Sequence, residues 1–116
     1  MEIILEQEFI TALFLLVAVH FLCDTALQGD FLAKNKVRYN SDGDYNPIWW
    51  WALTAHSFIH ALGAYLISHS LELAALMLIS HWIIDLMKGE GYLTFKQDQF
   101  AHIVIVVCIA LVMHGM

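Results

Sequence analysis

The chain has 116 residues, of which 60% are hydrophobic and 14% are charged, and its formal net charge is −6. Apolar residues make up about half of an ordinary soluble domain, so this excess predicts a protein embedded in a membrane. Only five lysines and arginines are present. This excludes a nucleic-acid partner, because phosphate backbones are bound by clustered cations.

The first predicted membrane span covers residues 9–27, close to the roughly 20 residues needed to cross a bilayer. Acidic residues precede it, without the basic start and cleavage site of a secretory signal, so we expect the span to remain in the mature protein. Residues 28–47 are polar and contain a turn sequence at 41–44. Their front part, 31–37, predicts a short amphipathic helix at the membrane interface.

Three further spans are predicted at residues 48–67, 71–87 and 98–113. The connection at 68–70 is so short that the second and third spans must form an antiparallel hairpin. Three tryptophans at 49–51 are typical of an aromatic belt at a bilayer surface. We therefore predict an all-α polytopic membrane protein. Residues 1–116 would form a single domain, a four-transmembrane-helix bundle with a short interfacial helix after the first span.

The basic residues predict the orientation of this bundle. All of them fall at the first and third connections, whereas the termini and the second connection have none: Lys34, Lys36, Arg38, Lys88 and Lys96. By the positive-inside rule, these two connections are cytoplasmic and both termini lie outside.

Four pairs of histidine or aspartate residues are spaced four positions apart. Each pair shares a helix face, because four residues turn about 400°. The predicted topology brings all four pairs to the cytoplasmic leaflet, so we expect the side chains to converge inside the bundle. The pairs are His20 with Asp24, His56 with His60, His81 with Asp85, and Asp98 with His102.

This set predicts a metal site. A charged aspartate at the bilayer centre costs about 2.5–3.5 kcal/mol, so the three carboxylates need compensation. Imidazole and carboxylate are ligands of Zn²⁺ and similar divalent ions, and eight of them predict one or two ions, with zinc the expected metal. One His-x-x-x-His pair alone would more often be packing. A proton relay or a hydrogen-bonded polar core is the alternative for the whole set.

Other polar residues predict a substrate-binding rim on the same side. Lys88 lies seven residues after His81 on the same helix face and is predicted to hold a substrate phosphate or to pair with Asp85. Gln28, Lys34 and Lys36 are predicted to line the entrance. Attraction to anionic lipids explains these lysines almost as well.

Several runs together resemble a known but uncharacterised family. These are His20 to Gln28, Ala33 to Lys36, His56 to His60, His81 to Lys88 and Asp98 to His102. They resemble small integral membrane proteins of bacteria and their phages, and the resemblance covers nearly the whole chain. It implies a four-helix topology in the bacterial inner membrane. A looser similarity, in residue type and spacing, is to membrane-bound metal-dependent hydrolases, although their second, glycine-containing His/Asp signature is missing.

The expected function is a membrane-embedded metal-dependent hydrolase at the cytoplasmic leaflet that acts on a phosphoester or lipid-linked substrate. Among Asp24, Asp85 and Asp98, one that does not bind the metal would act as general base, and Lys88 would neutralise the substrate anion. Two alternatives stay open: a divalent-metal or proton transport element, and a structural or regulatory phage membrane protein stapled by its metal. Membrane lipids are the expected partners, and so thin a core is compatible with a homo-oligomer.

Overall fold

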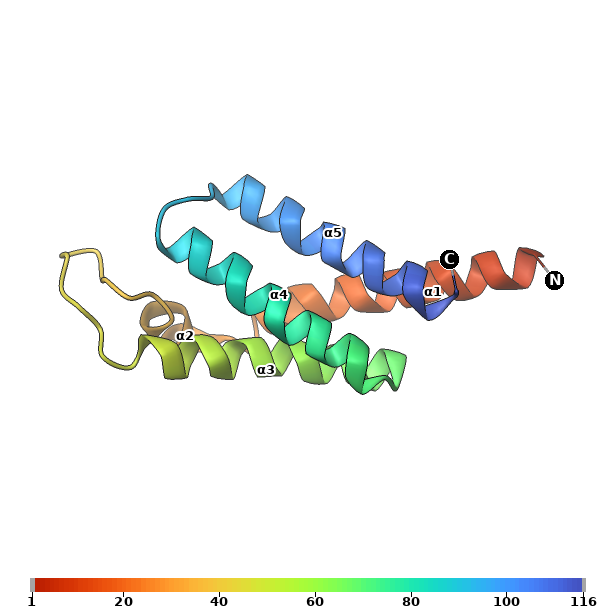
Figure 1. The fold of residues 1–116 in the computed structure, drawn as a ribbon, viewed down its shortest axis with the longest axis horizontal. Helices are drawn as coiled ribbons and strands as arrows, with labels where there is room; N and C mark the ends of the chain where they lie inside the picture. The colour runs from red at the N-terminus through yellow and green to blue at the C-terminus, as the bar shows by residue number, and fades with distance from the viewer. Residues whose placement is uncertain (1, 116) are drawn as a thin grey trace.

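The computed structural model describes residues 2–115, with side chains described from residue 7 onward, and this part of the chain is all-α. Its helices are α1 (Glu2–Asp24), α2 (Gly29–Asn35), α3 (Trp49–Ser68), α4 (Leu71–Gly89) and α5 (Phe95–Met113). Helices α1, α3, α4 and α5 pack along one another, and short α2 lies beside α3 (Figure 1). Both termini lie at one end of the molecule, and the connections before α3 and before α5 lie at the other (Figure 1).

Local signals fix the helix ends. The α3–α4 hairpin turns at His69, whose backbone is left-handed (φ 56°) and whose N–H donates to the Tyr65 carbonyl at 2.7 Å. Ser70 then caps α4 by accepting a hydrogen bond from the Leu73 N–H. Thr94 and Gln97 form a capping box at the start of α5. The expected hairpin is therefore present.

The prediction of four transmembrane spans is wrong. In the part of the chain that the structure describes, two helical segments are long and apolar enough to cross a membrane by length and composition, Gln7–Asp24 and Phe95–Met113. Tryptophans and histidines lower the hydropathy of α3, and α4 carries the charged residues Glu72, Asp85 and Lys88. Of these polar residues, the two histidines of α3 and Asp85 of α4 are also among the residues counted as a site. The expected interfacial helix corresponds in position to α2.

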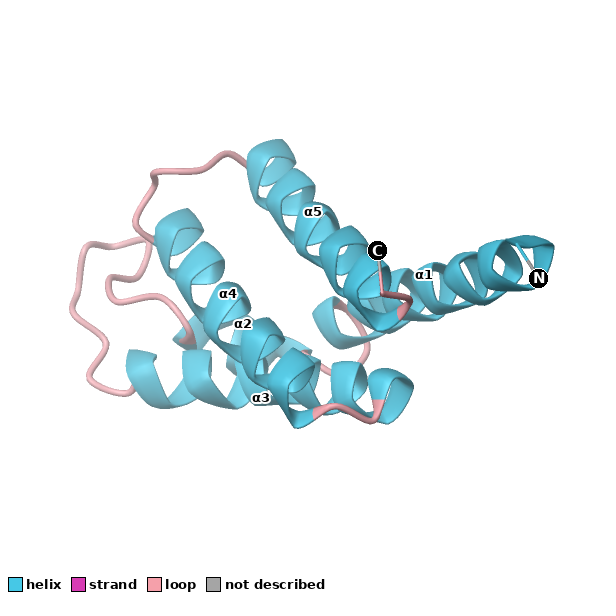
Figure 2. Ribbon diagram, turned by 45° about the vertical axis from the view of Figure 1, so that its right-hand side comes forward, coloured by secondary structure: helices cyan, strands magenta, loops and turns pink. Residues whose placement is uncertain are grey.

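The interior is divided along its length. Toward the termini it is an apolar core of Leu16, Ala64, Leu73, Met77, Val106, Ile109 and Ala110. Toward the long connections it is polar, and it contains the buried histidines and aspartates. Between these halves, helices α1 and α3 approach each other closely at Gly63. A Cβ atom added there would lie only 2.3 Å from Val19 Cγ1. Figure 2 shows the amino-terminal part of α1 extending beyond the other helices.

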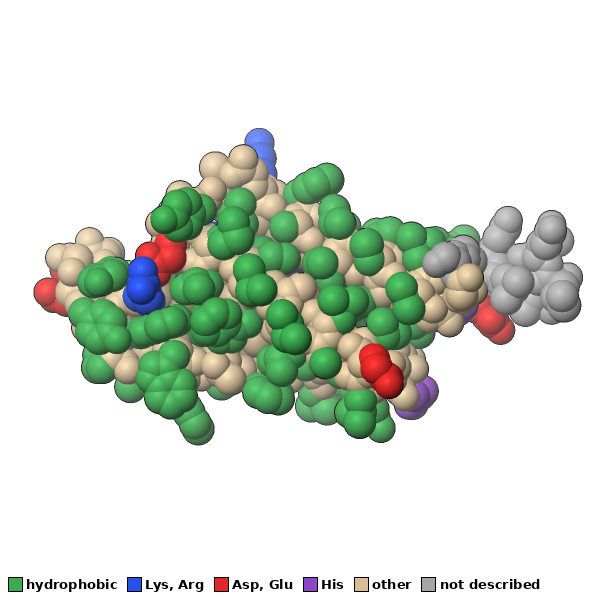
Figure 3. Space-filling model, in the orientation of Figure 1, with side chains coloured by type: hydrophobic (Ala, Val, Ile, Leu, Met, Phe, Trp, Pro, Cys, Tyr) green, Lys and Arg blue, Asp and Glu red, His purple; other side chains and the backbone are tan. Residues whose placement is uncertain are grey.

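Large apolar side chains are exposed on the outer faces of the helices. Phe14 on α1, Leu71 on α4 and Phe100 on α5 each expose 70% or more of their surface. Figure 3 shows apolar side chains spread over the visible face, with charged side chains gathered near its ends. An exposed apolar surface of this kind marks a lipid or protein contact in most proteins.

Candidate metal centre

All eight predicted metal-ligand residues come together in the polar half of the bundle. Each long helix contributes one pair: α1 gives His20 and Asp24, α3 gives His56 and His60, α4 gives His81 and Asp85, and α5 gives Asp98 and His102. Because neighbouring helices run antiparallel, the end of α1, the middle of α3, the end of α4 and the start of α5 lie at one level (Figure 1). Seven of the eight are buried, and Asp24 is partly exposed.

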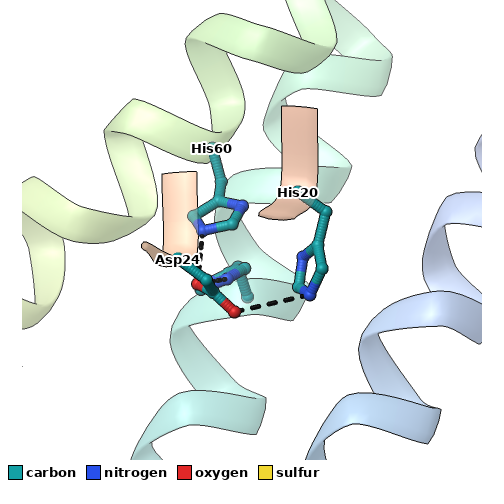
Figure 4. A group of neighbouring side chains, drawn as sticks. His20, Asp24 and His60 are labelled. Carbon is teal, nitrogen blue, oxygen red and sulfur yellow. Dashed lines mark hydrogen bonds and ion pairs between the residues drawn. The ribbon is translucent and has the colours of Figure 1, made fainter. Parts of the chain in front are cut away.

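Asp24 lies within 4 Å of four of the histidines, with His81 Nε2 the farthest at 3.9 Å from its Oδ1. Its Oδ1 lies 3.1 Å from His56 Nε2 and 2.9 Å from His60 Nε2, both hydrogen bonds. Its Oδ2 lies 3.4 Å from His20 Nε2. Figure 4 shows the His60 and His20 rings directed at the two oxygens of this carboxylate. Asp24 therefore draws α1 and α3 together through one polar group.

Asp85 of α4 connects helices in the same way as Asp24. Its Oδ1 accepts a hydrogen bond from His102 Nε2 at 3.0 Å, which links α4 to α5. Its Oδ2 lies 3.4 Å from His56 Nε2 and 3.0 Å from Lys36 Nζ. The same His102 Nε2 is 3.2 Å from Asp98 Oδ1. Two carboxylates from different helices thus meet at one imidazole.

His81 lies between these two groups. Its ring stacks on His60, with centroids 3.7 Å apart, and on His102, with centroids 4.3 Å apart. Neither ring nitrogen of His81 has a hydrogen-bond partner among the described residues, although both are buried. His56 Nδ1 and Asp98 Oδ1 are also buried and make no hydrogen bond, although Asp98 Oδ1 has the ion-pair contact with His102 described above.

Such unpaired atoms test whether a metal fits the residues present. Each buried polar atom left without a partner costs about 1–3 kcal/mol, so native proteins rarely leave several in one place. Here they belong to imidazoles and a carboxylate, the donors that bind zinc through a lone pair. Each neutral imidazole offers one lone pair, so a divalent cation would give a partner to one nitrogen of His81 and to the Asp98 oxygen. These residues therefore fit a divalent cation.

The ligand atoms form three overlapping sets, in each of which all atoms lie within 4.8 Å of one another. Two sets share no residue, and the third, made of His56, His81 and Asp85, joins them. The two separate sets are His20, Asp24, His60 and His81, and Asp85, Asp98 and His102. With neutral histidines, three carboxylates and Lys36 leave two negative charges in the cluster, which suits a divalent cation.

The residues predicted to bind substrate have separate positions. Lys36 reaches the cluster and pairs with Asp85. The Gln28 side chain donates to the Asp24 carbonyl at 3.0 Å, so it stabilises the end of α1. Lys34 is exposed on α2, and Lys88 is exposed with its ammonium 5.3 Å from the Phe95 ring centroid. The structure therefore does not bring Lys34 or Lys88 to the cluster.

One contact residue was missed. Gln99 Oε1 lies 3.2 Å from His20 Nε2, and Gln99 Nε2 donates to Asp98 Oδ2 at 3.1 Å. Gln99 precedes His102 by three residues, which places it near the same helix face, so an i, i+3 reading would have included it.

A second ion pair, also missed, lies just outside the cluster. The Arg38 guanidinium forms two hydrogen bonds with the Glu90 carboxylate. These bonds hold the pKa of Glu90 below its ordinary value and raise that of Arg38. The pair fastens the connection before α3 to the end of α4.

The fold and cluster together define a small all-helical protein with a buried histidine–aspartate centre. Residues 12–116 match the model of a family described as protein of unknown function, DUF3307, and the chain belongs to that family. The expected resemblance to an uncharacterised family is therefore confirmed. Comparison with curated proteins and with solved structures finds no match.

Proposed function

We propose that this protein is a metal-dependent hydrolase that acts on phosphoesters, with zinc the expected metal and up to two ions bound. The observation that supports this most is the presence of two separate ligand sets within one buried cluster. Adjacent metal positions of this kind suit phosphoester hydrolysis, in which the attacking and leaving oxygens both need stabilisation.

The two sets differ in the number of ligands they offer. The set around Asp24 has four, which fills a tetrahedral zinc ion and is typical of a closed site. The set of Asp85, Asp98 and His102 has three, which leaves one position for water or substrate, as in catalytic zinc sites. A metal held by these three residues would supply an activated water, whose pKa such ions lower to about 7. Carboxylate oxygens of Asp85 or Asp98 that do not bind the metal are the proton acceptors we propose.

Transport is less well supported. A conducting path would continue from the cluster through the rest of the bundle. In the described interior, that half is filled by apolar side chains such as Leu16, Met77 and Val106. A polar cluster confined to one half of the interior suits an enzyme better than a channel. In the third alternative, the metal only stabilises the helix bundle. The protein would then bind metal but hydrolyse no substrate.

We further propose that the protein works at a bacterial membrane and contacts lipid through α1 and α5. Both contain a segment with the length and composition of a span, and both expose large apolar side chains, such as Phe14 and Phe100. In this proposal both termini lie outside, and the substrate is either a soluble phosphoester or one linked to a lipid. Extraction of membranes with alkaline carbonate tests it, because a peripheral or soluble protein would be released.

The experiment for the enzyme is metal analysis combined with phosphoesterase assays. We expect at least one zinc per chain and chelator-sensitive hydrolysis of p-nitrophenyl phosphate or its diester. Asp98→Asn should lower kcat at least about a hundredfold, whereas Asp30→Asn, on the exposed face of α2, should have no effect. Less than about half a metal ion per chain would reject the metal centre. Full metal content with no hydrolysis of either ester would reject the enzyme.

A further inference from the structure

Lys36 is the one lysine or arginine that contacts the cluster among the described side chains. Its ammonium lies 3.0 Å from Asp85 Oδ2, and its side chain is 17% exposed. It therefore lies at the solvent edge of the cluster, on the Asp85 oxygen that also faces His56, while the other oxygen, Oδ1, faces His102 of the three-ligand set of Asp85, Asp98 and His102. The other four basic residues make no hydrogen bond or ion pair with any cluster residue that the structure describes.

The backbone that carries Lys36 is fixed on both sides by contacts that do not involve Asp85. Before it, the Asn35 side chain accepts a hydrogen bond from Asn46 Nδ2 at 2.9 Å. After it, Val37 packs so closely on Gly89 that a Cβ there would lie 3.1 Å from Val37 Cγ1. Arg38 then pairs with Glu90. Lys36 would therefore stay at the edge of the cluster even if Asp85 took another partner.

A metal ion at the three-ligand set would be such a partner. Once the Asp85 carboxylate binds a divalent cation, the nearby ammonium loses its counter-charge and is repelled by the ion. A lysine held in place next to a metal, with no anion of its own, is the arrangement that recognises a phosphate group. The exchange costs little reorganisation, because only the end of a flexible side chain has to turn.

We propose that Lys36 binds the phosphate group of the substrate beside the three-ligand metal position, exchanging Asp85 for that anion. This inference rests on the proposed function and specifies its substrate class: an ester with a free anionic phosphate, either a soluble compound or a lipid headgroup. It replaces Lys88, which lies outside the cluster, as the substrate-binding cation.

The experiment measures binding of inorganic phosphate, by calorimetry, to zinc-loaded wild type, Lys36→Met, Lys36→Arg and Lys96→Met. Methionine keeps the length of the stem and removes the charge, arginine keeps the charge, and Lys96 is an exposed lysine in the first turn of α5. Removal of one charge-assisted contact should weaken phosphate binding about tenfold or more. We expect that loss in Lys36→Met, and near-wild-type affinity in the other two variants.

Zinc content is measured on the same samples. This distinguishes a failure of the proposed hydrolase from a failure of the proposed role of Lys36. Wild type without zinc would reject the proposed function itself. Normal zinc content with equal phosphate affinity in wild type and Lys36→Met would overturn the role of Lys36 while leaving the metal centre intact. Repeating the titration with phosphatidic acid in detergent micelles distinguishes the sources, since a lipid headgroup would bind more tightly than free phosphate and show the same dependence on Lys36.

Discussion

The imidazole rings of His60 on α3 and His81 on α4 stack with centroids 3.7 Å apart and planes inclined by 27°. Their helices form the antiparallel hairpin, so this contact lies inside the bundle, with both rings buried. Two imidazolium cations at that distance would repel strongly in a buried site, which favours neutral rings. Neutral rings carry free lone pairs, the form in which histidine binds metals.

Replacing His81 should therefore remove metal. His81 belongs to two of the three ligand sets, and its ring has no hydrogen-bond partner to lose among the described residues. Loss of even an outer partner of a metal ligand costs about 10–100-fold in metal affinity, so His81→Ala should cost more than about a hundredfold. Competition with a fluorescent zinc chelator measures this. His69→Asn, at the far end of α3, is the control, and equal affinities in both variants would contradict the prediction.

Because two ligand sets share no residue, we expect that each of two zinc ions can be removed without the other. His102→Ala removes a ligand of the three-residue set and leaves the four-residue set intact. His60→Ala does the reverse. If both positions are filled, each variant should fall from about two zinc ions per chain to about one, and the double variant should hold none. Elemental analysis after gel filtration gives the number, and a total loss in either single variant would indicate one shared ion.

The cluster was predictable because helix periodicity is a local property. Four pairs at i, i+4 needed only helical backbone to share a face, and their places along antiparallel helices set a common level. Lys36 was less certain, since its partner Asp85 lies 49 residues away and the connecting segment is irregular. Gln99 was missed because a residue next to Asp98 points about 100° away from it around a helix.

The number of spans was predicted wrongly, although the sequence already held the information, because α3 and α4 fail a test of length and composition alone. Residues 48–67 and 71–87 were counted as spans for their apolar content. The same stretches carry three tryptophans in α3 and Glu72, Asp85 and Lys88 in α4. The tryptophans and histidines lower the mean hydropathy of α3, and the three charged residues make α4 too polar for a span, so counting them would have removed both from the prediction.

Gly63→Ala should destabilise the protein, although alanine is normally the better helix residue by about 0.8–1 kcal/mol. The new Cβ would lie 2.3 Å from Val19 Cγ1, and valine has one strongly preferred rotamer in a helix, so it cannot move aside easily. Overpacking of this kind costs about 1–3 kcal/mol. Chemical denaturation measures the change. Val19→Ala in the same chain should restore most of it, and a Gly63→Ala protein as stable as wild type would contradict the close approach.

The Arg38–Glu90 pair should make stability depend on pH in the acidic range. The folded-state pKa of Glu90 is lowered, so the pair contributes above the unfolded-state pKa, about 4.3, and its contribution is lost as the pH falls through the lower, folded-state value. Melting temperatures measured from about pH 6 to pH 3 should therefore fall more steeply for wild type than for Glu90→Gln. Parallel curves for the two proteins would show that the pair contributes nothing.

His69→Gly should stabilise the α3–α4 hairpin. His69 has φ 56° and ψ 27°, a left-handed conformation that costs a residue with a Cβ about 1–2 kcal/mol and glycine almost nothing. Glycine also gains freedom in the unfolded chain, which offsets part of the benefit, so we expect the free energy of unfolding to rise by about 0.5–1 kcal/mol. The edge contact between the Tyr65 and His69 rings, with centroids 6.4 Å apart, is lost but lies at the surface. Ser68→Gly, one residue earlier and still helical, should instead lower stability, and a loss in both variants would argue against the left-handed turn.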